Sequence, residues 1–160
     1  MKRALGFALV AVVVCLLAMQ LYRPARTNPP VDETMTLGRR LDVAAPVDAL
    51  LTRSCLDCHS NKTRWPWYSN VAPVSWLVIS DVSKARNHVN FSEWGSYEPA
   101  EQMHWLDKMC VMAREERMPL PSYRFIHRGT ALSAGDIKML CDWTKATREK
   151  IEAKMQDAAD

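Results

Sequence analysis

Cys55, Cys58 and His59 form a Cys-x-x-Cys-His string at the start of the stretch "CLDCHSNKTRWPWY". Two thiols separated by two residues can reach both vinyl groups of one haem, and the histidine that follows is then placed to ligate the iron. The string therefore predicts one covalently attached haem c. In this interpretation Cys55 and Cys58 form the thioethers and His59 is the proximal iron ligand.

Three other chemistries use paired cysteines, and each needs a feature that this sequence lacks or supplies poorly. A structural zinc site needs four ligands, usually from a second Cys-x-x-Cys or a close histidine pair, but the remaining cysteines and histidines lie singly. A thioredoxin-like dithiol follows a β-strand, whereas a helical pattern precedes this string. A plain disulfide across so short a loop would be strained. These alternatives stay open, and haem is preferred.

An electron-carrying haem needs a sixth ligand, and Met118 is the preferred candidate. It stands in "EERMPLPSY", where Pro119 and Pro121 end a helical pattern and stiffen the loop that carries the thioether. Fifty-nine residues separate it from His59, enough chain to reach the opposite face of a haem. His127 or an open iron site are the alternatives.

Aromatic residues follow the proximal histidine closely. Trp65, Trp67 and Tyr68 are expected to pack around the haem edge, where an indole N–H can reach a propionate or a carbonyl. The alternative is that they are ordinary core residues.

Cys110 and Cys141 fall on the apolar faces of two separate predicted helices. In an oxidising compartment such a pair can form a disulfide. Two buried thiols are the alternative, and a Cα–Cα distance beyond about 7 Å would exclude the bridge.

Apolar periodicity predicts an all-α fold that holds these residues in place. A short helix opens at Pro46 and ends at the cysteine string, and another spans about 74–89. A third begins near Pro99, and the last begins at Ser133, a good N-cap followed by Asp136. No alternating pattern typical of β-strands stands out.

The N-terminal segment is long and apolar enough to cross a membrane. Residues 4–22 carry no charge, and nineteen helical residues span roughly 28 Å, about one hydrocarbon core. The sequence is thus divided into a membrane anchor at 1–26, a tether at 27–45, a haem-binding domain at 46–150 and a helical tail at 151–160. A cleaved signal peptide is the alternative for the anchor.

The charge balance argues against nucleic acid as a partner. Four of the 21 basic residues belong to the first 26 positions, and the remaining 17 face 18 acidic residues. A surface that binds phosphates needs an excess of lysine and arginine on the folded domain.

Residues from about Val47 to Trp143 resemble the bacterial haem-binding domain family of small, exported, cytochrome c-like domains. The resemblance rests on the haem string with "SNKTRWPWYS", on "NFSEW", and on the "MPLPSY" loop with His127 downstream. It implies covalent haem, a periplasmic location and Met118 as the counterpart of the family's Met-Pro loop.

These observations together predict a single-pass protein of the bacterial inner membrane that faces the periplasm. It would exchange single electrons with redox protein partners and would not be an enzyme, because no constellation of a catalytic base and nucleophile is seen. Two alternatives are a haem-based sensor or peroxidase with an open iron site, and a haem-bearing accessory subunit of a membrane complex.

Overall fold

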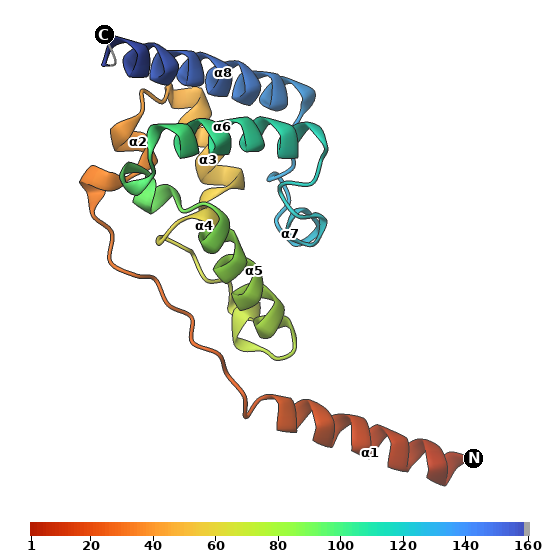
Figure 1. Ribbon diagram of the computed structural model, residues 1–160. Coiled ribbons are helices and arrows are strands. Elements are labelled where there is room, and N and C mark those ends of the chain that lie inside the picture. The colour runs from red at the N-terminus through yellow and green to blue at the C-terminus, as the bar shows by residue number, and fades with distance from the viewer. Residues whose placement is uncertain (159–160) are drawn as a thin grey trace.

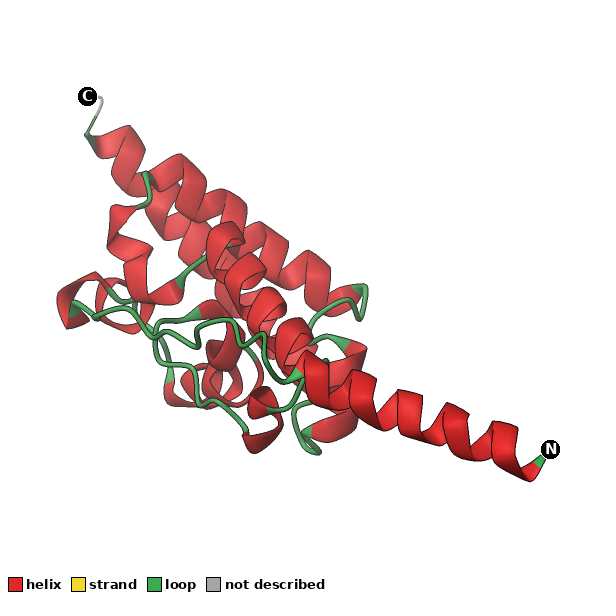
Figure 2. Cartoon of the chain, turned by 90° about the horizontal axis from the view of Figure 1, so that it is seen from below, coloured by secondary structure: helices red, strands yellow, loops and turns green. Residues whose placement is uncertain are grey.

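The computed structural model describes residues 1–158, and this part of the chain is helical with no β-strand (Figures 1 and 2). The predicted all-α class is therefore confirmed. In chain order the elements are α1 (Lys2–Met19), η1 (Glu33–Met35), α2 (Leu37–Arg40), α3 (Ala45–Ser54), α4 (Leu56–His59), η2 (Trp67–Asn70), α5 (Val74–His88), η3 (Phe91–Ser96), α6 (Pro99–Arg114), α7 (Pro121–Ile126) and α8 (Ala134–Asp157).

The helices begin where the sequence places starting signals. Proline occupies the first turn of α3, α6 and α7, where its missing N–H costs no hydrogen bond. Ser133 and Asp136 form a reciprocal capping box at the start of α8, with the Ser133 side chain accepting from the Asp136 N–H at 3.1 Å. The predicted helices at 74–89, from Pro99 and from Ser133 are confirmed.

The hydrophobic core lies between α3, η3, α6 and α8, and α6 runs alongside α8 (Figure 1). Its least exposed members are Leu50 and Leu51 of α3, Trp94 of η3, Leu106 of α6 and Leu140 of α8, each at most 2% exposed. The burial of each leucine side chain contributes about 1.5–3 kcal/mol to the free energy of folding. This core fixes the C-terminal end of α3, from which the cysteine string continues.

The segment 27–45 is not the free tether that its composition led us to expect. Leu37 is buried in the core and Leu41 packs against it, because two residues four apart in a helical turn share one face. The Arg86 guanidinium donates to the Thr27 carbonyl at 2.8 Å, and the Trp143 indole donates to the Asp42 carbonyl at 3.1 Å. The segment therefore belongs to the folded domain.

The C-terminal helix α8 runs through the predicted boundary at residue 150 without a break. Ile151 packs against the core, and Arg148 pairs with Asp107 of α6 at 2.7 Å. Residues 152–157 form the exposed end of the helix, and 159–160 of the predicted tail lie outside the described residues.

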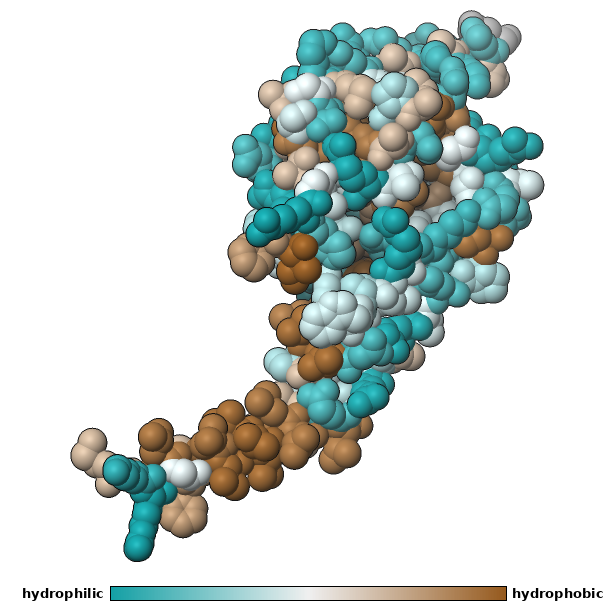
Figure 3. Space-filling model, turned by 180° about the vertical axis from the view of Figure 1, so that it is seen from behind, coloured by the Kyte–Doolittle hydropathy of each residue, from teal (hydrophilic) through white to brown (hydrophobic). Residues whose placement is uncertain are grey.

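α1 projects away from the rest of the molecule as an apolar helix of 18 residues, none of them buried (Figures 1 and 3). A helix of this length spans about 27 Å, close to the thickness of a hydrocarbon core. Its length, composition and exposure suit a membrane anchor or a signal sequence.

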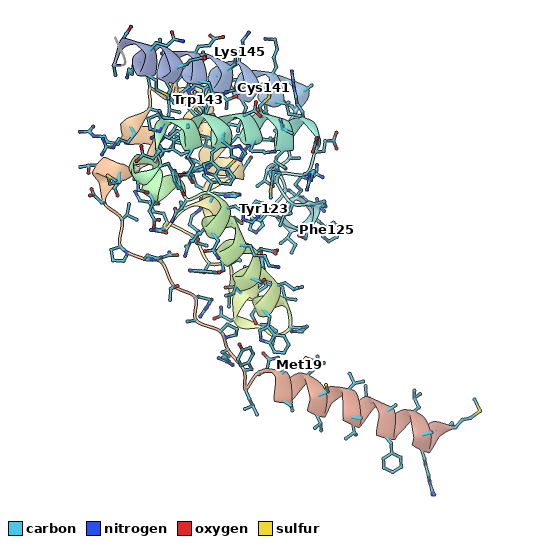
Figure 4. All side chains as sticks on the ribbon, viewed as in Figure 1. Met19, Tyr123, Phe125, Cys141, Trp143 and Lys145 are labelled. Atoms are coloured by element: carbon cyan, nitrogen blue, oxygen red, sulfur yellow. A yellow bond between two sulfur atoms is a disulfide. The ribbon has the colours of Figure 1, made fainter. Side chains whose placement is uncertain are left out.

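A disulfide joins Cys110 of α6 to Cys141 of α8, with the two Cα atoms 4.8 Å apart (Figure 4). The bridge links the two helices that pack most extensively on each other. It closes a loop whose ends are 31 residues apart in the sequence.

We expect a Cys110→Ser, Cys141→Ser double variant to lose about 3–4 kcal/mol of unfolding free energy, because the open loop regains conformational entropy in the unfolded state. Urea titration of the full chain followed by circular dichroism measures this loss. The control is Cys15→Ser, which changes an exposed thiol on α1 and should leave the midpoint unchanged. A double variant as stable as wild type would contradict the prediction.

Candidate haem-binding site

The cysteine string begins at the end of α3 and forms one short helical turn. The Ser54 hydroxyl donates to the Thr130 carbonyl at 3.0 Å and fixes this end of α3. The amides of Cys58 and His59 both donate to the Cys55 carbonyl, at 3.2 and 3.0 Å. Because residues three and four apart are neighbours on a helical turn, the two thiols and the imidazole come from one compact stretch of backbone.

Neither Cys55 nor Cys58 is disulfide-bonded, and both side chains are half-buried. Burial, followed by the neighbouring Cys58, raises the pKa of the Cys55 thiol to about 12. Burial and the charges of Asp57 and Asp81 raise the pKa of the Cys58 thiol to about 11. The thiols of a reactive dithiol have lowered pKa values instead.

His59 is oriented as a ligand imidazole. Its Nδ1 lies 3.0 Å from the Val89 carbonyl, and its ring stacks on Phe91 with centroids 5.7 Å apart. Burial lowers the pKa of His59, and the carbonyls of Val89 and Ala85 oppose this effect. A neutral ring whose Nδ1–H donates to a carbonyl leaves the Nε2 lone pair for a metal, which is the usual arrangement of an iron-bound histidine.

A buried polar network holds the Val89 carbonyl in this position. Asn90 donates from its side chain to Asn61 Oδ1 at 2.8 Å, and Asn61 donates from its backbone to the Ser92 hydroxyl at 3.0 Å. The Asn90 N–H also donates to the Tyr97 hydroxyl at 2.8 Å. None of these residues had a predicted role in the site. Asn90 and Ser92 belong to the "NFSEW" motif, which could have indicated a role for them. The acceptor for His59 itself is a backbone atom, which no motif reveals.

Two hydrogen bonds join the cysteine string and the segment after it to the region of α7. The Tyr123 hydroxyl donates to Asp57 Oδ2 at 2.9 Å, and the Tyr68 hydroxyl lies 2.5 Å from His127 Nε2. The Tyr123 and His127 rings stack with centroids 4.3 Å apart. Figure 4 shows Tyr123 on the side of α7 that is turned towards α4. The chain after Met118 is thereby tied to residues next to the predicted haem attachment.

Asp57 lies at the centre of this contact. Burial opposes its ionisation, but hydrogen bonds from Arg64 and Tyr123 together lower the pKa of its carboxyl. Arg64 Nε lies 3.0 Å from Asp57 Oδ1. A cavity of about 570 Å³ opens beside this group, and its lining includes Arg53 and Arg128.

We expect Tyr123→Phe to lower the unfolding free energy by about 1–2 kcal/mol, because a half-buried carboxylate loses a hydrogen-bond donor. Urea titration measures the change. Tyr22→Phe is the control, since Tyr22 is 67% exposed and should tolerate the change within about 0.5 kcal/mol. Equal stability of Tyr123→Phe and wild type would show that the hydrogen bond between Tyr123 and Asp57 contributes nothing.

The three aromatic residues predicted at the haem edge lie in different environments. The Trp65 indole nitrogen is buried and has no hydrogen-bond partner among the described residues, so it is an available donor inside the domain. Tyr68 reaches His127, as described above. Trp67 lies at the surface with 78% of its area exposed. It follows Pro66 at the start of η2, a turn that directs Ser69 inwards.

Met118 lies on the short connection between α6 and α7. Glu116 ends α6 in the left-handed region at φ 53°, and the amides of Arg117 and Met118 both donate to the Met112 carbonyl. Pro119 is buried while Met118 remains 38% exposed. The loop is therefore fixed at both ends, and the Met118 side chain is accessible. The hydrogen bond between Tyr123 and Asp57 connects the chain that follows this loop to the cysteine string.

The residues present fit a covalently held haem better than a zinc ion. The site offers two thiols without a disulfide in one turn, an imidazole whose Nδ1 faces a carbonyl and leaves Nε2 for a metal, and a buried indole N–H that has no partner among residues 1–158. Within residues 1–158, no group of three or more histidine, cysteine or acidic side chains is placed to hold a metal ion. A zinc site with four protein ligands thus has no candidate partners here.

A family model described as a haem-binding domain matches residues 14–146. The chain belongs to the haem-binding domain family. The match begins within α1 and includes the whole segment 27–45, in agreement with the packing of that segment on this haem-binding domain. The region is wider than the resemblance from Val47 to Trp143. No curated protein and no solved structure matches the chain significantly.

Proposed function

We propose that this haem-binding domain is a membrane-anchored, periplasm-facing monohaem c-type cytochrome that transfers single electrons between redox protein partners. The observation that carries the proposal is the geometry of the Cys-x-x-Cys-His string. Cys55 and Cys58 carry no disulfide and lie within one helical turn, and His59 Nδ1 lies 3.0 Å from the Val89 carbonyl, which leaves Nε2 for a metal.

Each residue of the site has a distinct task in this proposal. Cys55 and Cys58 hold the cofactor through thioethers, and His59 binds the iron through Nε2. Met118 is the sixth ligand. Its loop is held by α6, by Pro119 and by the hydrogen bond between Tyr123 and Asp57. Haem held by these residues would supply a one-electron couple, and a methionine ligand would raise its potential.

No catalytic residue is assigned, because electron transfer needs no group that moves a proton or attacks a substrate. The protein's own contribution is to attach, orient and shield the cofactor. The Asn61, Asn90 and Ser92 network serves this purpose by holding the acceptor for His59 Nδ1.

A haem-based sensor or peroxidase is the alternative, and it requires that Met118 does not bind the iron, so that the sixth position is open. The accessory-subunit alternative would instead be supported by co-purification with one membrane complex and by full activity of that complex with Met118→Ala.

The test of the proposal is expression of the full chain together with a cytochrome c maturation system. After denaturing electrophoresis, haem should remain on the polypeptide, and the intact protein should titrate as a single one-electron couple in a potentiometric measurement. A colourless matured protein, or one that releases all its haem on denaturation, would overturn the proposal.

A further inference from the structure

Four large apolar side chains from η2, the connection after it and α5 are exposed. Trp67 of η2 is 78% exposed and Leu77 of α5 is 66% exposed, and Val71 and Val74 between them are 45% and 40% exposed. We call these four residues the η2–α5 patch. Large apolar side chains that gather on a protein surface often mark a place that another surface covers.

The patch lies where α1 joins the domain, and specific contacts fix this junction. The Gln20 side-chain amide donates to the Ala72 carbonyl and accepts from the Ala72 N–H, both at 3.0 Å. The Trp76 indole donates to the Tyr22 carbonyl at 2.9 Å, and the two rings meet edge to face at 5.8 Å. α1 is therefore attached to the start of α5 by side-chain contacts in addition to the connecting chain.

Hydrophobic side chains of the domain lie close to the end of α1. Figure 3 shows hydrophobic side chains on the part of the domain nearest α1, with hydrophilic side chains between them and the helix. Figure 4 shows Met19, at the end of α1, beside the start of α5 and well away from Phe125 of α7. Arg23 and Arg26 follow the apolar helix directly, and Arg26 Nη1 donates to the Ser69 hydroxyl at 3.3 Å.

We propose that the η2–α5 patch inserts into the headgroup region of the same lipid bilayer that holds α1. This inference rests on the membrane anchor in the proposed function. The bilayer is the occupant because the contacts of Gln20 and Trp76 hold the patch at the level where α1 leaves the hydrocarbon core. Tryptophan is enriched at this depth, and arginine there meets lipid phosphates.

The consequence is a fixed orientation of the domain on the membrane. The start of α5 faces the lipid, while α6 and α8 lie at the opposite end of the molecule from α1 (Figure 1). The exposed Met118 loop and α7 remain accessible to a water-soluble redox partner.

The experiment places a nitroxide spin label on the full haem-loaded chain, in vesicles of phosphatidylethanolamine and phosphatidylglycerol. Leu77→Cys carries the label in a Cys15→Ser background, and Phe125→Cys is the matched control, because Phe125 is an apolar residue that is 86% exposed on α7. Power saturation compares access to oxygen, which concentrates in lipid, with access to a water-soluble nickel chelate, each relative to the same sample under nitrogen.

We expect the ratio of oxygen access to nickel access to be several-fold higher at position 77 than at position 125. Equal ratios in a protein that stays in the membrane after carbonate extraction would overturn the inference and leave the anchor intact. Release of the protein by carbonate would instead refute the anchor in the proposed function, and with it this inference. An unchanged haem spectrum shows that both labelled variants are folded.

Discussion

A double variant with Cys55→Ala and Cys58→Ala is expected to retain no haem after denaturation, whereas the wild-type chain should retain all of it. The reason is that a thioether survives unfolding, while iron ligation by His59 is lost when the fold is lost. The single variant Cys58→Ala keeps one attachment point, so its haem should remain on the polypeptide. Its pyridine haemochrome band should then shift to the position typical of one unsaturated vinyl group. Haem staining after denaturing electrophoresis and haemochrome spectra measure both outcomes.

The matched control for these variants is Cys15→Ser. Cys15 is also an unpaired cysteine, but it lies exposed on α1 and far along the chain from His59. Its replacement should leave both thioethers in place. If Cys58→Ala kept a spectrum of two linkages, or if Cys15→Ser lost one, the assignment of the attachment residues would be wrong.

The sequence allows a prediction of the chemistry of this site because the residues that would carry it are close together in the chain. Cys55, Cys58 and His59 share one helical turn, so their spacing contains most of the geometry. The partner of His59 could not be identified in this way. It is the carbonyl of Val89, 30 residues away, and a backbone acceptor leaves no trace in residue type.

Contacts between segments that are distant in the sequence explain most of the other differences between the prediction and the structure. Tyr123 donates to Asp57, which is 66 positions away in the sequence, and neither residue type indicates that the other is its partner. The segment 27–45 is rich in proline and threonine, a composition typical of linkers. One helical turn with Leu37 and Leu41 is too short to produce a recognisable period, yet these two side chains are enough to attach the segment to the core.

The helices could be predicted because their signals are local. Pro99 and Pro121 occupy the first turns of α6 and α7, and Ser133 with Asp136 caps α8. The exposure of Trp67 could not be predicted by the same reasoning, since aromatic residues near a histidine suit both a haem edge and a surface. The burial of neighbouring Trp65 depends on how η2 turns, and tertiary packing decides that.

Replacement of the proposed sixth ligand should have the second large effect. In Met118→Ala we expect the reduction potential to fall by on the order of 100 mV, a fraction of the roughly 0.8 V that axial ligands span. The physical reason is that a thioether stabilises ferrous over ferric iron more than water does. The reduced variant should also bind carbon monoxide rapidly and stoichiometrically, whereas the wild-type protein should bind it slowly or not at all. Potentiometric titration and stopped-flow spectroscopy provide the two measurements.

Met155→Ala is the control that separates ligation from the general loss of a methionine. Met155 lies on α8 and is 41% exposed, close to the 38% of Met118, so both variants remove a side chain of equal size and similar accessibility. Only the Met118 variant should change the potential and the carbon monoxide kinetics. Rapid carbon monoxide binding by the wild-type protein would instead favour the sensor or peroxidase alternative, because the sixth position would then be open without any substitution. Rapid carbon monoxide binding by the wild-type protein, together with an unchanged reduction potential in Met118→Ala, would exclude Met118 as an iron ligand.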